Sequence, residues 1–207
     1  MSDPRVNVIR FPAGLQLLEG GWNDLLAGSP ADSVFLTWEW QTTWWKHLAA
    51  GRPLVVVAVW HEDVLIAIAP FVRGHRRALR LGLPALELLG SGDVGSDYLD
   101  VIVRSGFERV AYRALAEALA REGALVDARR LAEGESDLGR VAVRLRLEGW
   151  SQAIVSRDVC PCIPLSGATW ESFLAGLGRE HRYNTRRRLR RLHSSFHVEL
   201  SQVTREE

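Results

Sequence analysis

The sequence predicts an α/β fold of the α+β kind, in which a mixed and largely antiparallel sheet is flanked by helices. Two observations predict it. Leu54–Trp60 and Val64–Val72 are β-branched runs on either side of the short polar turn His61–Asp63, which is the pattern of a hairpin. Apolar residues recur at helical spacing on both sides of this hairpin, and the last such segment, 179–191, is rich in arginine.

The segment before the hairpin predicts one strand and two helices. Val6–Phe11 is the expected strand. Leucines between Leu15 and Leu26 follow a helical period that Gly28–Pro30 ends. Thr37 is a suitable N-cap for a second helix, which should run to Leu48.

The hairpin itself is apolar almost throughout, which predicts a sheet covered on both faces. Pro70 is expected at a strand end or a bulge, because proline cannot donate to the ladder. Arg73–Arg80 is expected to be a polar connection. Leu86–Leu89 and Tyr98–Val103 are the next expected strands, joined by the glycine-rich loop 90–96.

Ser105 and Glu108 have the spacing of a capping box, which predicts a helix that closes at Gly123. The remaining expected elements are a strand at Leu125–Ala128, a helix over Leu138–Leu145 ended by Gly149, strands at Ala153–Val155 and Ile163–Leu165, a helix capped by Thr169, the arginine-rich helix after Gly178, and the start of a strand at Val198–Val203.

Composition excludes several classes of protein. No apolar run reaches the roughly 20 residues of a membrane span, and Met1–Arg5 lacks the pattern of a signal peptide. The chain has two cysteines, Cys160 and Cys162, fewer than secreted domains of this size tend to use. We therefore expect a cytoplasmic protein without a metal, in which both thiols are small buried residues on a strand.

The motif Gly90–Gly95 matches G-x-G-x-x-G, but a strand-like segment follows it where a dinucleotide site needs a helix. We expect a flexible connection there. Asp97 and Asp100 flank Tyr98, so a general acid or base role for Asp97 or Tyr98 stands beside the alternative of turn chemistry.

Four tryptophans cluster within eight positions. They are Trp38, Trp40, Trp44 and Trp45. Aromatic residues at helical spacing usually pack into a core, and the alternative is that one or two of them line an acceptor groove.

The arginine-rich segment 179–191 carries seven arginines and one glutamate, a formal charge of +6, which leaves −5 for the rest of a chain whose total is +1. Arg182, Arg186 and Arg190 are spaced i, i+4, i+8, and Arg187 and Arg191 lie beside them. These arginines are expected opposite an apolar stripe of Leu189, Leu192 and Phe196. The helix is either a solvated face or an anion site for a coenzyme phosphate, a phosphorylated acceptor, RNA or an acidic membrane.

Several segments together resemble the CelD-like branch of the GNAT acyltransferases, which is related to the FemAB proteins. In chain order they are Phe35–Trp40 with Trp44–Trp45, Ala67–Phe71, Ser96–Asp100, Cys160–Leu165, and Trp170–Leu174 running into Arg182–Leu192. The last is the closest match. The resemblance spans nearly the whole chain.

The resemblance implies two GNAT-like lobes in tandem and transfer of an acyl group from acyl-CoA, without a metal, to an amine or hydroxyl of a small molecule or glycan precursor. Residues 1–168 would be the N-terminal lobe, and 169–207 a connector to a second lobe missing here. The GNAT pyrophosphate loop is absent, so this chain alone is expected to be incomplete. The candidate substrate-binding residues are Trp38, Trp40 and Trp44, the candidate catalytic residues are Asp97 and Tyr98, and the candidate anion or cofactor ligands are Arg182, Asn184, Arg186, Arg187 and Arg190.

Other functions stay open. The chain could be an anion- or RNA-binding module that uses the arginine helix, an aminoacyl-tRNA-dependent transferase like FemAB, or a purely structural docking lobe. Nucleic acid is disfavoured, because aromatic residues do not alternate with the arginines in the sequence.

Overall fold

The computed structural model describes residues 3–78, 81–92 and 94–201 of the chain. Contacts divide the chain into two units, residues 1–153 and 154–207, which are described separately below. Among the described residues, no helix combines the length and the apolar character needed to cross a membrane.

The first unit is built on one mixed sheet. Its strand order is β1-β2-β3-β4-β6, and β5 pairs with β3 beside this path. All neighbours are antiparallel except β4 and β6, which are parallel. The strands are β1 (Arg5–Ile9), β2 (Leu54–His61), β3 (Val64–Ala78), β4 (Leu81–Leu88), β5 (Ile102–Val103) and β6 (Leu125–Asp127). The predicted hairpin and fold class are confirmed.

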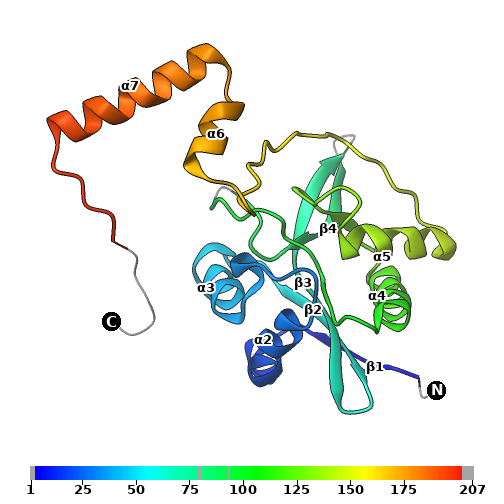
Figure 1. Ribbon diagram of the computed structural model, residues 1–207. Coiled ribbons are helices and arrows are strands. Elements are labelled where there is room, and N and C mark those ends of the chain that lie inside the picture. Colours follow the sequence, from blue (N-terminus) through cyan, green and yellow to red (C-terminus); the bar gives the residue numbers. More distant parts are fainter. Residues whose placement is uncertain (1–2, 79–80, 93, 202–207) are drawn as a thin grey trace. The chain divides into compact units, whose positions relative to one another are not determined.

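Helices cover both faces of this sheet, α2 and α3 on one side and α4 and α5 on the other (Figure 1). They are α1 (Pro12–Gln16), α2 (Glu19–Ala27), α3 (Trp38–Leu48), α4 (Glu108–Glu122) and α5 (Asp137–Leu145), with short 3-10 turns η1 (Val34–Leu36) and η2 (Arg146–Glu148). Leu54–Val59 are fully buried between the two helical layers. This burial explains why the β2 sequence is apolar without alternation.

Strand β3 is longer than predicted, because Arg73–Ala78 continues it instead of forming a polar connection. This part of β3 pairs with β4, whereas Ala67 and Ile68 pair with β5. Pro70 therefore lies inside the strand, where the partner changes. Its carbonyl accepts from Leu89 N at 2.9 Å, and Leu89 O, to which a proline cannot donate, accepts from Gln41 Nε2 at 3.2 Å.

Two other predictions for this unit were wrong. Only Ile102 and Val103 of the expected strand 98–103 are in the sheet, where they pair with Ile68 and Ala67 of β3. Ser105 is not a cap either. The helix begins after Phe107, and Glu108 accepts from Gly106 N at 2.9 Å. Gly123 does close the helix with a positive φ of 60°.

The second unit contains α6 (Trp170–Gly176) and α7 (Arg179–Ser195). Thr169 caps α6 as predicted, with Ser172 completing a capping box. The expected strands at Ala153–Val155 and Ile163–Leu165 are absent, since no described strand pairs with them. The described part of Val198–Val203 is not a strand, and residues 202 and 203 lie outside the described residues. The predicted domain limit at residue 168 stays a prediction.

Candidate functional site

The tryptophans of helix α3 point in different directions and make different contacts. Thr37 begins the helix by accepting from Trp40 N at 3.3 Å. Trp38 packs edge-on against the fully buried Trp22, with ring centroids 5.6 Å apart, and Trp44 is 3% exposed. Trp38 and Trp44 thus contribute to the core, as the simpler interpretation expected. Trp40 alone of these three bonds to the glycine-rich loop.

Trp40 and Gln41 fasten that loop to α3. The Trp40 Nε1 donates to Ser96 Oγ at 3.1 Å, and the Gln41 Nε2 donates to Leu89 O at 3.2 Å. Between these points the chain turns at Gly90, whose φ is +91° and whose added Cβ would lie 2.9 Å from Leu99 Cδ2. The glycine motif therefore permits a tight turn against α3, and no helix follows it to bind a dinucleotide.

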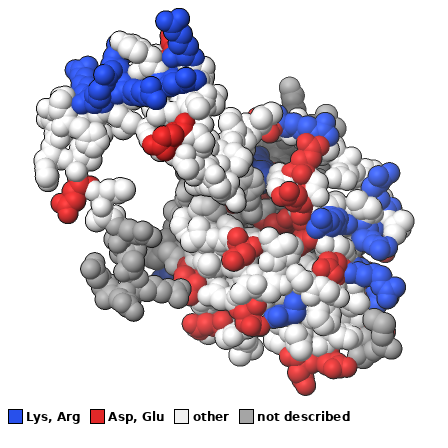
Figure 2. Space-filling model, viewed as in Figure 1, with Lys and Arg blue, Asp and Glu red and all other residues white. Residues whose placement is uncertain are grey.

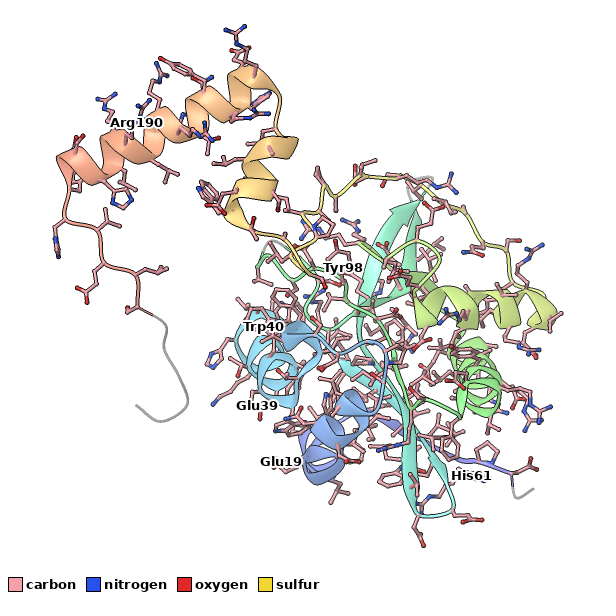
Figure 3. All side chains as sticks on the ribbon, viewed as in Figure 1. Glu19, Glu39, Trp40, His61, Tyr98 and Arg190 are labelled. Atoms are coloured by element: carbon pink, nitrogen blue, oxygen red, sulfur yellow. The ribbon has the colours of Figure 1, made fainter. Side chains whose placement is uncertain are left out.

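Asp97 and Tyr98 are both exposed on this loop, where Figure 3 labels Tyr98. Tyr98 is 50% exposed and has a φ of +54°, a left-handed conformation that non-glycine residues rarely adopt. The Asp97 carboxylate lies 3.6 Å from Arg130, which also donates to Ser96 O at 3.4 Å. Arg130 has a positive φ of 58° as well. Trp40, Asp97, Tyr98 and Arg130 thus belong to one fastened cluster.

Asp100 holds the other end of the loop. Its Oδ1 accepts from Val101 N and Leu138 N, both at 2.7 Å, and its Oδ2 accepts from Asp137 N at 2.9 Å. Burial raises the pKa of the Asp100 carboxyl, and hydrogen bonds to Leu138, Val101, Ser136 and Asp137 oppose that rise. Asp100 therefore caps α5, so the two aspartates of this loop do not converge as an acid and base pair.

A buried polar contact supports α5 from α4. The Tyr112 hydroxyl donates to Asp137 Oδ1 at 2.6 Å, and Arg140 donates to the same oxygen at 3.0 Å. Burial, followed by the hydrogen bond to Asp137, raises the pKa of Tyr112 to about 12. The second Asp137 oxygen is buried without a hydrogen-bond partner in the described structure.

In the second unit, arginine side chains gather along α7 (Figure 2). Arg182 is the exception among them, because it is engaged with α6. Its Nε donates to Leu174 O at 2.8 Å, and its Nη2 donates to Ala175 O at 2.8 Å and to Leu177 O at 2.9 Å. A cation at the last carbonyls of a helix is favourable, so Arg182 fixes the α6–α7 corner.

The other arginines predicted as anion ligands fall into two groups. Arg186 and Arg190 line a groove between α6 and α7 together with Leu189, which was wrongly expected on the opposite face. Leu189 is three positions from Arg186 and therefore shares its side of the helix. Arg187 lies over the Tyr183 ring at 5.9 Å. Asn184 is half-buried and does not line this groove.

The two cysteines are exposed, contrary to the expected burial on a strand. Their segment forms no strand, so nothing covers them within it. Among the residues that the structure describes, no group of three or more His, Cys, Asp or Glu side chains could hold a metal ion.

The sequence analysis gave no role to Arg130, Ser96 or Gln41, whose contacts hold the loop in place. Local sequence carries no sign of the Arg130 contact, because Asp97 and Arg130 meet only through the fold. Gln41 had a weak sign. It is a polar residue on the apolar face of α3, and a buried amide there needs backbone partners.

No protein-family model matches the chain, and no curated protein matches it. Solved structures give matches of low identity. A ribosomal-protein-alanine N-acetyltransferase from Brucella melitensis biovar Abortus 2308 is 15% identical, with a TM-score of 0.40, covering 77% of this chain and 99% of its own.

Two further structures are similar at the same level. An aminoglycoside acetyltransferase from an uncultured soil metagenomic sample is 13% identical, with a TM-score of 0.45, covering 78% of this chain and 100% of its own. A glucosamine-6-phosphate N-acetyltransferase from Arabidopsis thaliana is 15% identical, with a TM-score of 0.39, covering 75% and 98%.

Proposed function

We propose that the chain is the N-terminal portion of an acyl-CoA-dependent N- or O-acyltransferase of the GNAT superfamily, in the CelD-like branch related to FemAB. In this proposal a second GNAT lobe follows residue 207, and the protein acts in the cytoplasm on a small-molecule or glycan-precursor acceptor. One observation carries it. Two segments of the family resemblance, Phe35–Trp40 and Ser96–Asp100, are joined by the hydrogen bond from Trp40 Nε1 to Ser96 Oγ.

The joined segments form a platform suited to an acceptor. Asp97 and Tyr98 are exposed on a loop that is held at two points. Trp40 of α3 bonds to Ser96, and Asp100 of the loop accepts from Leu138 N of α5. The left-handed Tyr98 costs conformational free energy, and such strain is concentrated at functional positions. We therefore assign the acceptor to this platform, with Trp40 beside it and with Trp38 and Trp44 supporting α3 from the core.

The chemistry of the platform suits an amine or hydroxyl. The Asp97 carboxylate can bind an ammonium group or accept a proton, and the Tyr98 hydroxyl can donate one. Arg130 neutralises Asp97 through a contact of 3.6 Å between half-exposed groups, which is weak enough for a charged acceptor to replace. Attack on a thioester would then gain from positioning as well as from proton transfer.

Acceptor-dependent release of coenzyme A tests the proposal. The product of the reading frame extended past codon 207 is incubated with acetyl-CoA and with amine, sugar or hydroxyl acceptors, and the free thiol is measured. Cys160 and Cys162 are exposed and would react with the thiol reagent, so the assay uses the Cys160→Ser, Cys162→Ser background. Thiol release that requires an acceptor supports the proposal. No release with any acceptor, together with no coenzyme A binding by calorimetry, would refute it.

A further inference from the structure

The groove between α6 and α7 has the size of a small-molecule site. Its volume is about 700 Å³, and all of its lining residues belong to the second unit. Arg182 fixes the two walls through its three bonds to carbonyls of the α6 end. Small-molecule pockets typically have volumes of about 300 to 1,000 Å³, and the volume of this groove lies within that range.

The lining of the groove is positively charged, which favours an anionic ligand. Arg179, Arg186 and Arg190 line it, and none of them forms an ion pair with an acid within the part of the chain that the structure describes. Arg186 and Arg190 are one helical turn apart, so both guanidinium groups can reach adjacent phosphates of one ligand. Like charges at this spacing also repel, and a bound anion would relieve that repulsion.

Two exposed aromatic rings line the same groove. Trp170 of α6 is 48% exposed and Tyr183 of α7 is 58% exposed. Exposed rings beside arginines are suited to stacking a nucleobase. The folded α6–α7 corner therefore supplies the pairing of aromatic residues with arginines that is absent from the linear sequence. Glu171 adds a carboxylate that can accept hydrogen bonds from ribose hydroxyls.

We propose that this groove binds a nucleoside diphosphate unit, with the base on Trp170 and Tyr183 and the diphosphate on Arg186 and Arg190. The inference deepens the proposed function and rests on it for the ligand's role. Such a unit is one end of coenzyme A, and it is also one end of a nucleotide-activated sugar acceptor. The two sources share this chemistry and differ in what is attached to the diphosphate.

Calorimetry on the 207-residue chain tests the site with ADP, UDP, coenzyme A and inorganic pyrophosphate as probes. The variant Arg186→Ser, Arg190→Ser removes the two groove charges. The matched control Arg188→Ser, Arg191→Ser removes two α7 charges that do not line the groove. ADP binding should weaken about tenfold or more in the groove variant and less than about twofold in the control. Circular dichroism confirms that both variants keep their helices.

The aromatic half of the site has its own readout. Trp170→Leu should weaken ADP binding while pyrophosphate binding is unchanged, because only the nucleotide has a base to stack. The proposal would be overturned if the two arginine variants lost ADP affinity equally. It would also be overturned if the wild type bound ADP no more tightly than pyrophosphate. A single-stranded RNA that binds with a steep salt dependence, equally reduced in both variants, would identify a non-specific polyanion surface instead.

The outcomes separate this inference from the acyltransferase proposal. Binding of ADP or UDP, without acceptor-dependent thiol release and without coenzyme A binding, supports the groove and removes the acyltransferase function. Thiol release without any nucleotide binding to the groove does the reverse. Coenzyme A binding tighter than UDP assigns the groove to the donor, and the opposite order assigns it to an activated acceptor.

Discussion

Replacing Asp100 with alanine should detach the candidate acceptor loop from α5. Asp100 is 8% exposed, and its carboxylate accepts from three buried backbone N–H groups, those of Val101, Asp137 and Leu138. A buried donor left without its partner costs about 1 to 3 kcal/mol. Burial of the carboxylate, which raises its pKa, offsets part of the stabilisation that these three hydrogen bonds provide. We therefore expect the free energy of unfolding to fall by about 3 kcal/mol, which is the lower end of the summed cost for three unpaired donors.

Urea unfolding followed by circular dichroism measures this loss. With a slope of about 2 kcal/mol per molar urea, the midpoint should fall by about 1.5 M. Asp97→Ala is the matched control, since it removes an exposed carboxylate three positions away and should stay within about 0.5 kcal/mol of the wild type. Asp100→Asn should be intermediate, because its amide keeps one acceptor oxygen but places N–H groups against a backbone donor. If Asp100→Ala and Asp97→Ala shift the midpoint equally, the anchoring role is wrong.

Three further outcomes are expected. Tyr112 should titrate at about pH 12, so stability should decline as pH rises from about 10 to about 12, because the unfolded tyrosine ionises first. In Asp137→Asn the tyrosinate absorbance should appear at lower pH, though still above pH 10 because burial remains, and an unchanged titration would contradict this. Arg182→Met should raise hydrogen exchange throughout α6, which a surface arginine replacement on α7 should not do. Gly90→Ala should destabilise the protein by about 1 to 3 kcal/mol. The control Gly92→Ala has a similarly positive φ but open space, so equal losses would exclude a packing role for Gly90.

Elements with a local capping signal were predictable from the sequence. Thr37 and Thr169 begin α3 and α6 where they were expected, and Gly123 and Gly149, both with positive φ, end α4 and η2. Each of these features depends on bonds within a few residues. The hairpin was predictable for the same reason, since its two strands are neighbours in the chain.

The errors concern pairing across long distances. Arg73–Ala78 is polar in sequence but becomes a strand because β4 pairs with it. Tyr98–Val101 has strand-like residues but stays in a loop, where α5 donates to Asp100 and Trp40 bonds to the nearby Ser96. The candidate site was therefore predictable only in part. Asp97 and Tyr98 could be named from the local sequence, whereas the contact of Asp97 with Arg130 depends on the tertiary fold.

The most direct test of the acyltransferase account is kcat/KM for acceptor-dependent thiol release in Asp97→Asn, measured in the cysteine-free background. Asp63→Asn is the control, because it neutralises an exposed carboxylate in the turn between β2 and β3. The account predicts a fall of about 100-fold or more for Asp97→Asn, the size of a proton-transfer contribution, and no change for the control. Equal kcat/KM values for wild type and Asp97→Asn would contradict the assignment of the acceptor to this loop.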